Sequence, residues 1–346
     1  MVQFSIAISG DREIEEYISI AKIVDESSFT NLSLYDDLLF KPAWPILSII
    51  AVNTERIKIG PAVLNPYLTH PAVIAANISV IDEISNGRAF VGIGKGAFLD
   101  FININSEKPI TAMKEAIEII QILTRGTKKP FHGAVFSLKD GAFFRWNTDY
   151  RAIPVMVGTW GERMSTLAGA KADEVKASPL WHSEYAKTLR SKIDQGAASA
   201  GRLASEIDLT LGVLTSVHND SDIAREFARN SLAIYLPHLH PMTKVMGVPQ
   251  SEISSVRKLS DLGKYSEASK LISDETLNNF CLYGSPSEIR SKITALVDST
   301  PVDKIEFGTP LGPNSYEAIN LLRTEVIPVS YTHLRAHETR HDLVCR

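Results

Sequence analysis

The chain is poor in cysteine, in long apolar runs and in unbalanced charge. Of its 346 residues only two are cysteine, Cys281 and Cys345, too few for the disulfide framework of a small secreted domain. No uninterrupted apolar run is long enough to predict a transmembrane helix. The 36 Lys and Arg residues face 40 Asp and Glu residues, for a net charge of −4. This balance gives no reason to expect nucleic acid or an anionic membrane as a partner.

Several motifs of common enzyme classes are also missing. There is no GxGxxG after the first predicted strand and no GxxxxGK[ST] loop, which argues against the dinucleotide-binding Rossmann and P-loop NTPase classes. The histidines have no HExxH or comparable spacing, so no metal site is predicted. Without a GxSxG elbow, covalent hydrolase chemistry is unsupported. No basic stretch precedes the first apolar segment, so no signal peptide is predicted and we expect a cytoplasmic protein.

The last eighteen residues differ from the rest in composition. Residues 329–346 hold three of the nine histidines and show neither helical nor strand periodicity. The string VSYTHLRAHET resembles the in-frame translation of a transposon-end adapter used to build sequencing libraries. We therefore interpret 329–346 as an artefactual tail and 1–328 as a single domain. His333, His337 and His341 stand four residues apart, but such spacing alone is weak evidence for a metal face.

Within residues 1–328, short β-like segments alternate with amphipathic helical ones. Helical segments place apolar residues three or four positions apart, on one face. Eight strands alternating with helices predict an α/β (β/α)8 TIM barrel rather than an open sheet. The predicted strands cover residues 2–8, 29–35, 56–65, 88–94, 153–158, 172–178, 206–217 and 302–308.

Local signals predict a helix and two insertions. Thr69 is the expected cap of a helix that ends at Asn86-Gly87, a C-terminal signal. Residues 134–138 and 142–146 are two short β-like pieces joined by an Asp-Gly turn, which predicts a β-hairpin. Residues 235–250 are broken by proline and too long for a plain connection, and we expect them to form a helical lid that excludes water.

The chemistry of a barrel enzyme lies where the strands end. The second strand ends at Asp36 and Asp37, a carboxylate pair that could serve as acid and base, or could simply be a solvated strand end or cap a helix. The fourth ends at Gly94-Lys95-Gly96, where the backbone can approach a planar ligand. The fifth ends at Gly158–Gly161, where free N–H groups at a helix start favour a phosphate. The alternative for this turn is that glycine only provides positive φ.

Three stretches, in the same order, resemble the signatures of one superfamily. They are GPAVLNPYLTHPAVIAANISVIDEISNGRAFVGIGKG, IPVMVGTWGERMSTLAGAKADEV and LYGSPSEIRSKITALVDSTPVDKIEFGTPLGPN. The chain is identified by them as a member of the luciferase-like monooxygenase superfamily. It is most similar to the F420-dependent methylenetetrahydromethanopterin reductase-like subgroup.

The resemblance implies an oxidoreductase that moves hydride between coenzyme F420, a deazaflavin, and a small organic substrate. It also implies a homodimer. One alternative is an FMN-dependent monooxygenase, and another is a catalytically inert flavin-binding barrel. The inert barrel is motivated by two departures from the family: Ala7 stands where the reductases often carry Glu, and Asp37 where His is common.

The resemblance also assigns roles to residues at the strand ends. An acidic residue near the deazaflavin corresponds to Asp36, and a non-prolyl cis peptide behind the ring corresponds to Ala62–Val63. The catalytic candidates are Asp36 and Asp37. Together with the strand-end reasoning, the predicted cofactor-binding residues are Asp36, Ala62, Val63, Asn65, Gly94, Lys95, Gly96, Gly158, Thr159, Trp160 and Gly161.

Overall fold

The computed structural model of the chain describes residues 2–96 and 99–327. The predicted artefactual tail, with Cys345 and its histidines, lies outside the described residues. Tertiary contacts divide the described chain into two compact units. The N-terminal unit comprises residues 5–177 and 188–210, and the C-terminal unit comprises residues 2–4, 178–187 and 211–327.

The N-terminal unit is built on short parallel strands. β1 pairs with β2 and β2 with β3, while β4 pairs with β7 and β7 with β8. From β2 to β8 nearly every strand residue is buried, as expected for parallel strands covered by helices. These strands are β1 (Gln3–Ile8), β2 (Asn31–Leu34), β3 (Lys58–Pro61), β4 (Val91–Gly94), β7 (Val155–Gly158) and β8 (Glu174–Ala177).

The strands follow the order of a closed barrel. β9 (Asp208–Val217) and β11 (Lys304–Leu311) complete the path β3-β2-β1-β11-β9-β8-β7-β4. Parallel bridges Ile59–Ala89 and Leu64–Ile93 then join β3 to β4, the two ends of that path. All eight predicted barrel strands are therefore confirmed, and with them the (β/α)8 fold.

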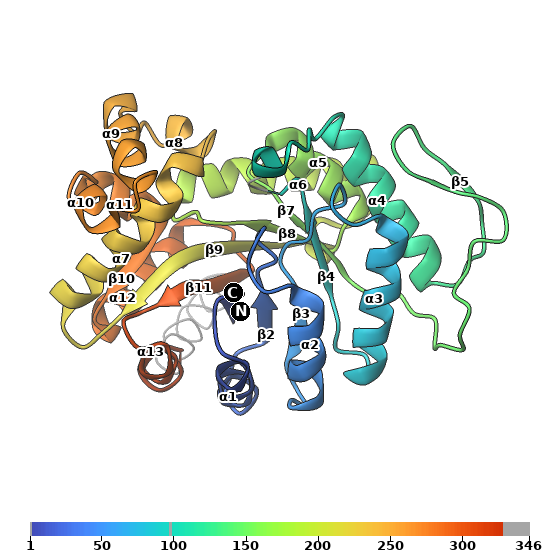
Figure 1. Cartoon of the computed structure of the whole chain (residues 1–346), viewed down its shortest axis with the longest axis horizontal. Helices are drawn as coiled ribbons and strands as arrows, with labels where there is room; N and C mark the ends of the chain where they lie inside the picture. The colour runs from blue at the N-terminus through green and yellow to red at the C-terminus, as the bar shows by residue number, and fades with distance from the viewer. Residues whose placement is uncertain (1, 97–98, 328–346) are drawn as a thin grey trace, which may run out of the picture. The chain divides into compact units, whose positions relative to one another are not determined.

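Helices connect the barrel strands of the N-terminal unit. α1 buries Tyr17, Ile20, Ala21 and Val24, three or four positions apart, which makes one apolar face. In Figure 1, α2, α3 and α4 follow one another along the unit, with α2 against α3 and α3 against α4. The helices are α1 (Ile14–Asp25), α2 (Ala43–Val52), α3 (Pro71–Ile84), α4 (Pro109–Thr124), α5 (Glu162–Lys171) and α6 (Ser183–Ser199), with short 3-10 turns at Leu99–Ile102 and Ala204–Glu206.

The start of α3 corrects the sequence prediction, whereas its end confirms it. His70, not Thr69, caps the helix, because its ring Nδ1 accepts the N–H of Ala72 at 3.1 Å. Imidazole can fill the role that a hydroxyl was expected to fill. After Ile84 the chain leaves the helix through Asn86 and Gly87, both with positive φ, as the Asn-Gly signal predicts.

The predicted hairpin exists, but its position was wrong. β5 (Phe131–His132) pairs antiparallel with β6 (Ser137–Leu138), and the second predicted strand, residues 142–146, is not a strand. The reason is Glu115 of α4, a buried carboxylate whose oxygens accept three successive backbone N–H groups, those of residues 134, 135 and 136, at 2.6–2.8 Å. This anchor places the turn before residue 137. Figure 1 shows the β5 segment extending away from α4.

Replacing Glu115 with Gln is expected to loosen this anchor. Burial alone would raise the pKa of Glu115, but the three N–H donors together lower it. Its stabilising effect is therefore present above the unfolded pKa and is lost as the pH falls through the folded value. We expect a loss of about 2 kcal/mol in the free energy of unfolding at pH 7, measured by urea denaturation. Glu118→Gln, which removes only a surface ion pair with Lys171, should cost at most about 0.5 kcal/mol; equal losses would contradict this anchor.

The C-terminal unit adds a strand that the sequence did not predict. β10 (Cys281–Gly284) pairs in parallel with β9, off the barrel path. This strand was missed because it has only four residues and begins directly after the end of a helix. The helices of this unit are α7 (Ser221–Tyr235), α8 (Met242–Val245), α9 (Gln250–Ser260), α10 (Tyr265–Ser269), α11 (Asp274–Phe280), α12 (Pro286–Ser299) and α13 (Ser315–Leu321), with a 3-10 turn at Leu236–His238 and a π-helical turn at Leu322–Val326.

Residues 235–250 are helical but interrupted, as their prolines suggested. The 3-10 turn that follows α7 is separated from α8 by a cis His240–Pro241 bond. Their role as a lid stays a prediction.

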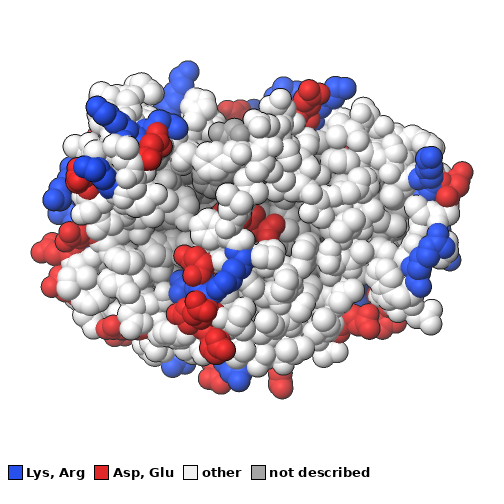
Figure 2. Space-filling view, in the orientation of Figure 1, with Lys and Arg blue, Asp and Glu red and all other residues white. Residues whose placement is uncertain are grey.

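Three further features of the described residues bear on possible partners: membrane-spanning helices, groups of metal ligands and surface charge. None of the helices in the described ranges is both long and apolar enough to cross a membrane. In those same ranges, no three His, Cys, Asp or Glu residues are grouped to hold a metal ion. On the face drawn in Figure 2, basic and acidic residues are interspersed rather than gathered by sign.

Candidate functional site

The two aspartates that follow β2 have different surroundings. Tyr35 still belongs to the barrel ladder, since its N–H donates to Ile8 at 2.9 Å. Asp36 Oδ1 accepts the N–H of Ala43, the first residue of α2, at 2.9 Å. Burial raises the pKa of Asp36, and this hydrogen bond opposes the rise. Asp36 thus satisfies an N–H group at a helix N-terminus, which is a structural role as well as a candidate chemical one.

Asp37 is the carboxyl group with the unusual protonation behaviour. Burial is the largest cause that raises its pKa, the negative charge of Asp36 adds to it, and Lys176 opposes it, giving a value of about 6. A carboxyl group with such a pKa can hold a proton near neutral pH and still release it. Of the two predicted catalytic residues, Asp37 therefore has the properties of an acid or base.

Val63 lies over the ends of β4 and β7. The Ala62–Val63 peptide bond is cis, as the resemblance implied. A Cβ atom on Gly94 would lie 2.6 Å from Val63 Cγ2, and one on Gly158 would lie 2.8 Å from Val63 Cγ1. Only glycine fits at either position without displacing Val63. Val63 in turn packs on the buried side chains of Ala62, Phe90 and Met156, so the surface is apolar and firmly supported.

Asn65 braces the loops that follow β3 and β4. Its Nδ2 donates to the carbonyl of Lys95 at 2.8 Å, and its Oδ1 accepts the N–H of Tyr67 at 2.7 Å. Gly96 has a φ of +82°, and a Cβ there would lie 2.0 Å from Asn65 Nδ2. Lys95 and Gly96 are exposed at the end of β4. The cofactor contacts predicted for these residues stay predictions, while the bracing by Asn65 is evident.

The turn between β7 and α5 is held to the barrel by its own backbone. The N–H of Thr159 donates to the carbonyl of Lys176 at 2.9 Å, and Thr159 Oγ1 accepts the N–H of Gly161 at 2.9 Å. Trp160 is partly exposed between them. Gly161 has a φ of −83° and meets no heavy atom closer than 3.6 Å at its Cβ position. The fold therefore does not require glycine here, which is consistent with close approach of a ligand; the predicted phosphate contact remains untested.

Lys176 is a residue of this site that the sequence reasoning missed. It lies on β8 with only 3% of its surface exposed. Its Nζ lies 3.4 Å from the carbonyl oxygen of Ala62 and 4.8 Å from the centre of the Tyr35 ring. The available signal was a lysine in the strand pattern Val-Lys-Ala, on the face opposite the two apolar residues.

The strand ends of the N-terminal unit thus bring together most of the predicted residues. Lys176 contacts the Ala62 carbonyl and its charge acts on Asp37, while Val63, next to Ala62, packs against Gly94 and Gly158. Ala7, where the reductases of the family often carry Glu, is fully buried on β1.

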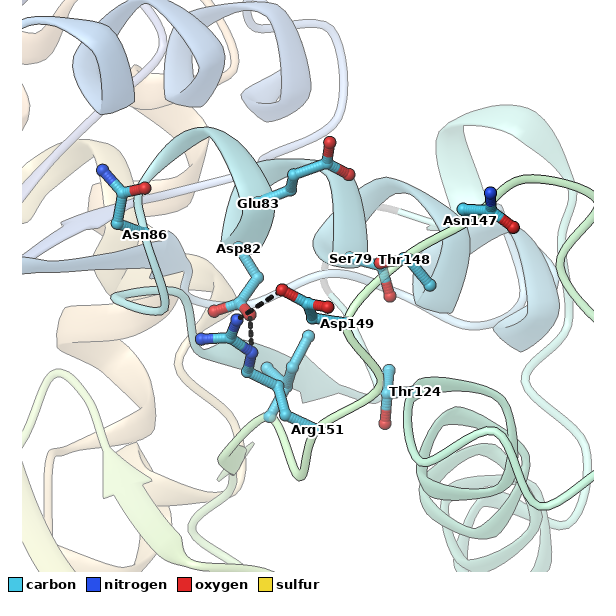
Figure 3. Close-up of a pocket in the computed structure, with 10 residues that line it drawn as sticks. Ser79, Asp82, Glu83, Asn86, Thr124, Asn147, Thr148, Asp149 and Arg151 are labelled. Atoms are coloured by element: carbon cyan, nitrogen blue, oxygen red, sulfur yellow. Dashed lines mark ion pairs between the residues drawn. The ribbon is translucent and has the colours of Figure 1, made fainter.

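A cavity of about 330 Å3 lies elsewhere in the same unit. It is lined by α3, by the end of α4 and by the segment that leads into β7, which is the amino-terminal side of the strands. Figure 3 shows Arg151 between Asp82 and Asp149, with its Nε 3.1 Å from the buried Asp82. None of the predicted site residues lines this cavity. Residues on this side of such a barrel typically contribute to stability rather than to the chemistry.

Comparisons with known proteins agree with this fold. A 5,10-methylenetetrahydromethanopterin reductase of Archaeoglobus fulgidus is 31% identical over 334 residues, covering 94% of this chain and 99% of the relative. An F420-dependent glucose-6-phosphate dehydrogenase of Microbacterium testaceum is 29% identical over 231 residues, covering 62% and 68%. The solved structure of the coenzyme F420 dependent tetrahydromethanopterin reductase from Methanopyrus kandleri aligns with a TM-score of 0.85 at 26% identity, covering 94% and 99%.

The family profile described as luciferase-like monooxygenase matches residues 2–303. The match spans most of the chain and includes every residue of the candidate site. The chain therefore belongs to the luciferase-like monooxygenase family and is similar over nearly its whole length to 5,10-methylenetetrahydromethanopterin reductases.

Proposed function

We propose that this chain is an F420-dependent oxidoreductase that transfers hydride between the deazaflavin and a small organic substrate. Similarity to a methylenetetrahydromethanopterin reductase over 94% of the chain supports the cofactor and the reaction class. A second group of similar proteins named as F420-dependent dehydrogenases supports the same cofactor with a different substrate. The substrate is accordingly proposed only as a small organic molecule.

The observation that carries the proposal is the apolar surface beside a carboxyl group with a raised pKa. Gly94 and Gly158 let Val63 pack directly on the ends of β4 and β7, because a Cβ on either glycine would meet Val63. The carbonyl of Ala62, next to Val63, lies 3.4 Å from Lys176 Nζ, and the charge of Lys176 acts on Asp37. An apolar surface with a polar border fits a deazaflavin, whose ring is planar and whose edge carries polar atoms.

The residues of the chain then have distinct tasks. F420 supplies the hydride chemistry when bound. Val63, Gly94 and Gly158 would support its ring, and the turn at 158–161 would approach its phosphate-bearing chain. Asp37 would hold the proton that accompanies hydride transfer. Asp36 keeps the segment after β2 in place through Ala43.

The test is a binding titration of residues 1–328 with F420 and, separately, with FMN, followed by cofactor fluorescence. We expect F420 to bind at least about tenfold more tightly than FMN, equivalent to about 1.4 kcal/mol. Preference for FMN would favour the monooxygenase alternative. Binding of neither would overturn the cofactor assignment and favour an inert barrel. Turnover of F420 with a panel of small alcohols, imines and pterin-like compounds then separates a binding protein from an enzyme.

A further inference from the structure

Lys176 is buried where a lysine is costly to bury. Along β8, Glu174 and Lys176 share one face of the strand, and Val175 and Ala177 share the other. All four side chains are buried. Glu174 has a partner in Thr210, whose hydroxyl donates to it at 2.6 Å. An ammonium group so far from water requires an opposite charge or several acceptors.

The groups around the Lys176 ammonium come from the ends of two other strands. The carbonyl oxygen of Ala62 accepts a hydrogen bond from it at 3.4 Å, and the Tyr35 ring lies 4.8 Å away. Its charge acts on Asp37, from the same segment as Tyr35. The charged groups that act on Asp37 are Asp36, beside it in sequence, and Lys176, from β8. One ammonium group therefore connects the segment after β2 with the segment after β3.

The backbone of Lys176 also holds the segment that follows β7. The Lys176 carbonyl accepts the N–H of Thr159, in the turn that follows β7. The backbone of Lys176 thus fixes the turn between β7 and α5, as that of any residue at this position could. Its side chain contacts the Tyr35 ring and the Ala62 carbonyl, and a residue that only filled space inside the barrel would need neither of these side-chain contacts.

We propose that Lys176 is a positioning residue of this active site, which ties Tyr35, two residues before Asp37, to the Ala62 carbonyl and provides the positive charge that acts on Asp37. This inference rests on the proposed function only for the chemistry that the proton serves. In the reductive direction, F420 would supply the hydride when bound, and Asp37 would give one proton to the substrate. Asp37 becomes a carboxylate beside the unchanged ammonium of Lys176, and water later returns the proton.

The first test is a titration of Asp37 in the full chain without cofactor. Aspartate labelled with 13C at the side-chain carboxyl is followed by NMR, and Asp37→Asn assigns the signal. The pKa of Asp37, about 6 in the parent protein, is expected to rise by about one pH unit or more in Lys176→Met, because an opposite charge at close range is lost. Lys176→Arg should restore most of the difference. Lys58→Met, a change at an exposed lysine of β3, is the matched control and should leave the signal unchanged. An unaltered titration in Lys176→Met would overturn the inference.

The second test covers the case in which Lys176→Met folds poorly. The melting temperatures of Lys176→Met, Asp37→Asn and the double variant are compared at pH 8. Asp37→Asn should raise the melting temperature in both backgrounds. If the two side chains are a pair, the gain should be at least about 2 °C larger in Lys176→Met than in the parent protein, because only there is the ionised carboxylate unpaired. An equal or smaller gain in Lys176→Met would overturn the pair. Neither test uses F420, so failure of the cofactor assignment and failure of this inference give different results.

Discussion

Asp37→Asn is expected to make the protein more stable at pH 8 and at the same time much less active. Burial and the neighbouring charge of Asp36 raise the pKa of Asp37 from 3.8 to about 6 despite the opposing charge of Lys176. A carboxyl group whose pKa is raised by folding contributes stability that is complete below pH 3.8 and is lost as the pH rises through 6. The difference of about two pH units corresponds to roughly 3 kcal/mol.

An asparagine at this position cannot ionise, so it avoids that loss. We expect the free energy of unfolding of Asp37→Asn to exceed that of the parent protein by up to about 3 kcal/mol at pH 8 and to approach it below pH 4. Urea denaturation at several pH values measures this. Asp298→Asn, an exposed change on α12, is the control for the effect of an amide. A variant less stable than the parent at pH 8 would show that the ionised carboxylate stabilises the fold, contrary to this argument.

The same substitution removes the group proposed to carry the proton. General acid or base catalysis by one side chain typically contributes a factor of about 100 to 10,000, so kcat of the F420-linked reaction should fall by about 100-fold or more. The affinity for F420 should change far less. In the reductive direction, the fall in rate as the pH rises through the pKa of Asp37 should also disappear. A variant with parental kcat would assign the proton transfer to another group.

The barrel could be predicted from the sequence because its signal is repeated. Each predicted strand is a short apolar run followed by an amphipathic helix, and parallel strands covered by helices must be apolar on both faces. All eight were found at the expected places. The hairpin was misplaced because its turn is set by Glu115, some twenty residues earlier on α4, and no local pattern reports that contact. The predicted Asp-Gly turn does form, with the N–H of Ala142 donating to the carbonyl of Lys139 at 3.2 Å, but no strand follows it.

The site could be predicted only as a set of strand ends. The sequence named both Asp36 and Asp37 but not the difference between them, which comes from the N–H of Ala43 on one side and burial on the other. Lys176 was overlooked because a lysine in a short strand usually marks a solvent-facing position. In a closed barrel both faces are buried, so the lysine points into the interior. Such a contact becomes visible only when β2, β3 and β8 are placed together.

Gly94→Ala and Gly161→Ala are expected to show separately whether F420 binds on the surface formed by Val63 and whether it approaches the turn at 158–161. A methyl group on Gly94 would lie 2.6 Å from Val63 Cγ2 and 3.2 Å from the carbonyl oxygen of Gly158. Val63 packs on a buried cluster and has little room to move. Overpacking of this kind typically costs about 1–3 kcal/mol. Gly94→Ala should therefore lower the free energy of unfolding by that amount and weaken F420 binding at least about tenfold.

Gly161→Ala should have the opposite balance of effects. Its φ of −83° suits alanine, and no heavy atom lies within 3.6 Å of the new methyl group. As the N-cap of α5 it should lose less than about 1 kcal/mol. If the cofactor approaches this turn, however, the methyl group would stand in its way, and F420 affinity should fall at least about tenfold. Parental affinity in Gly161→Ala would remove the turn from the cofactor site, whereas parental affinity in Gly94→Ala would remove the surface formed by Val63. Only Gly94→Ala should also lower stability by more than about 1 kcal/mol. Measuring unfolding and binding on both variants therefore distinguishes weaker binding caused by movement of Val63 from weaker binding caused by a methyl group in the path of the cofactor.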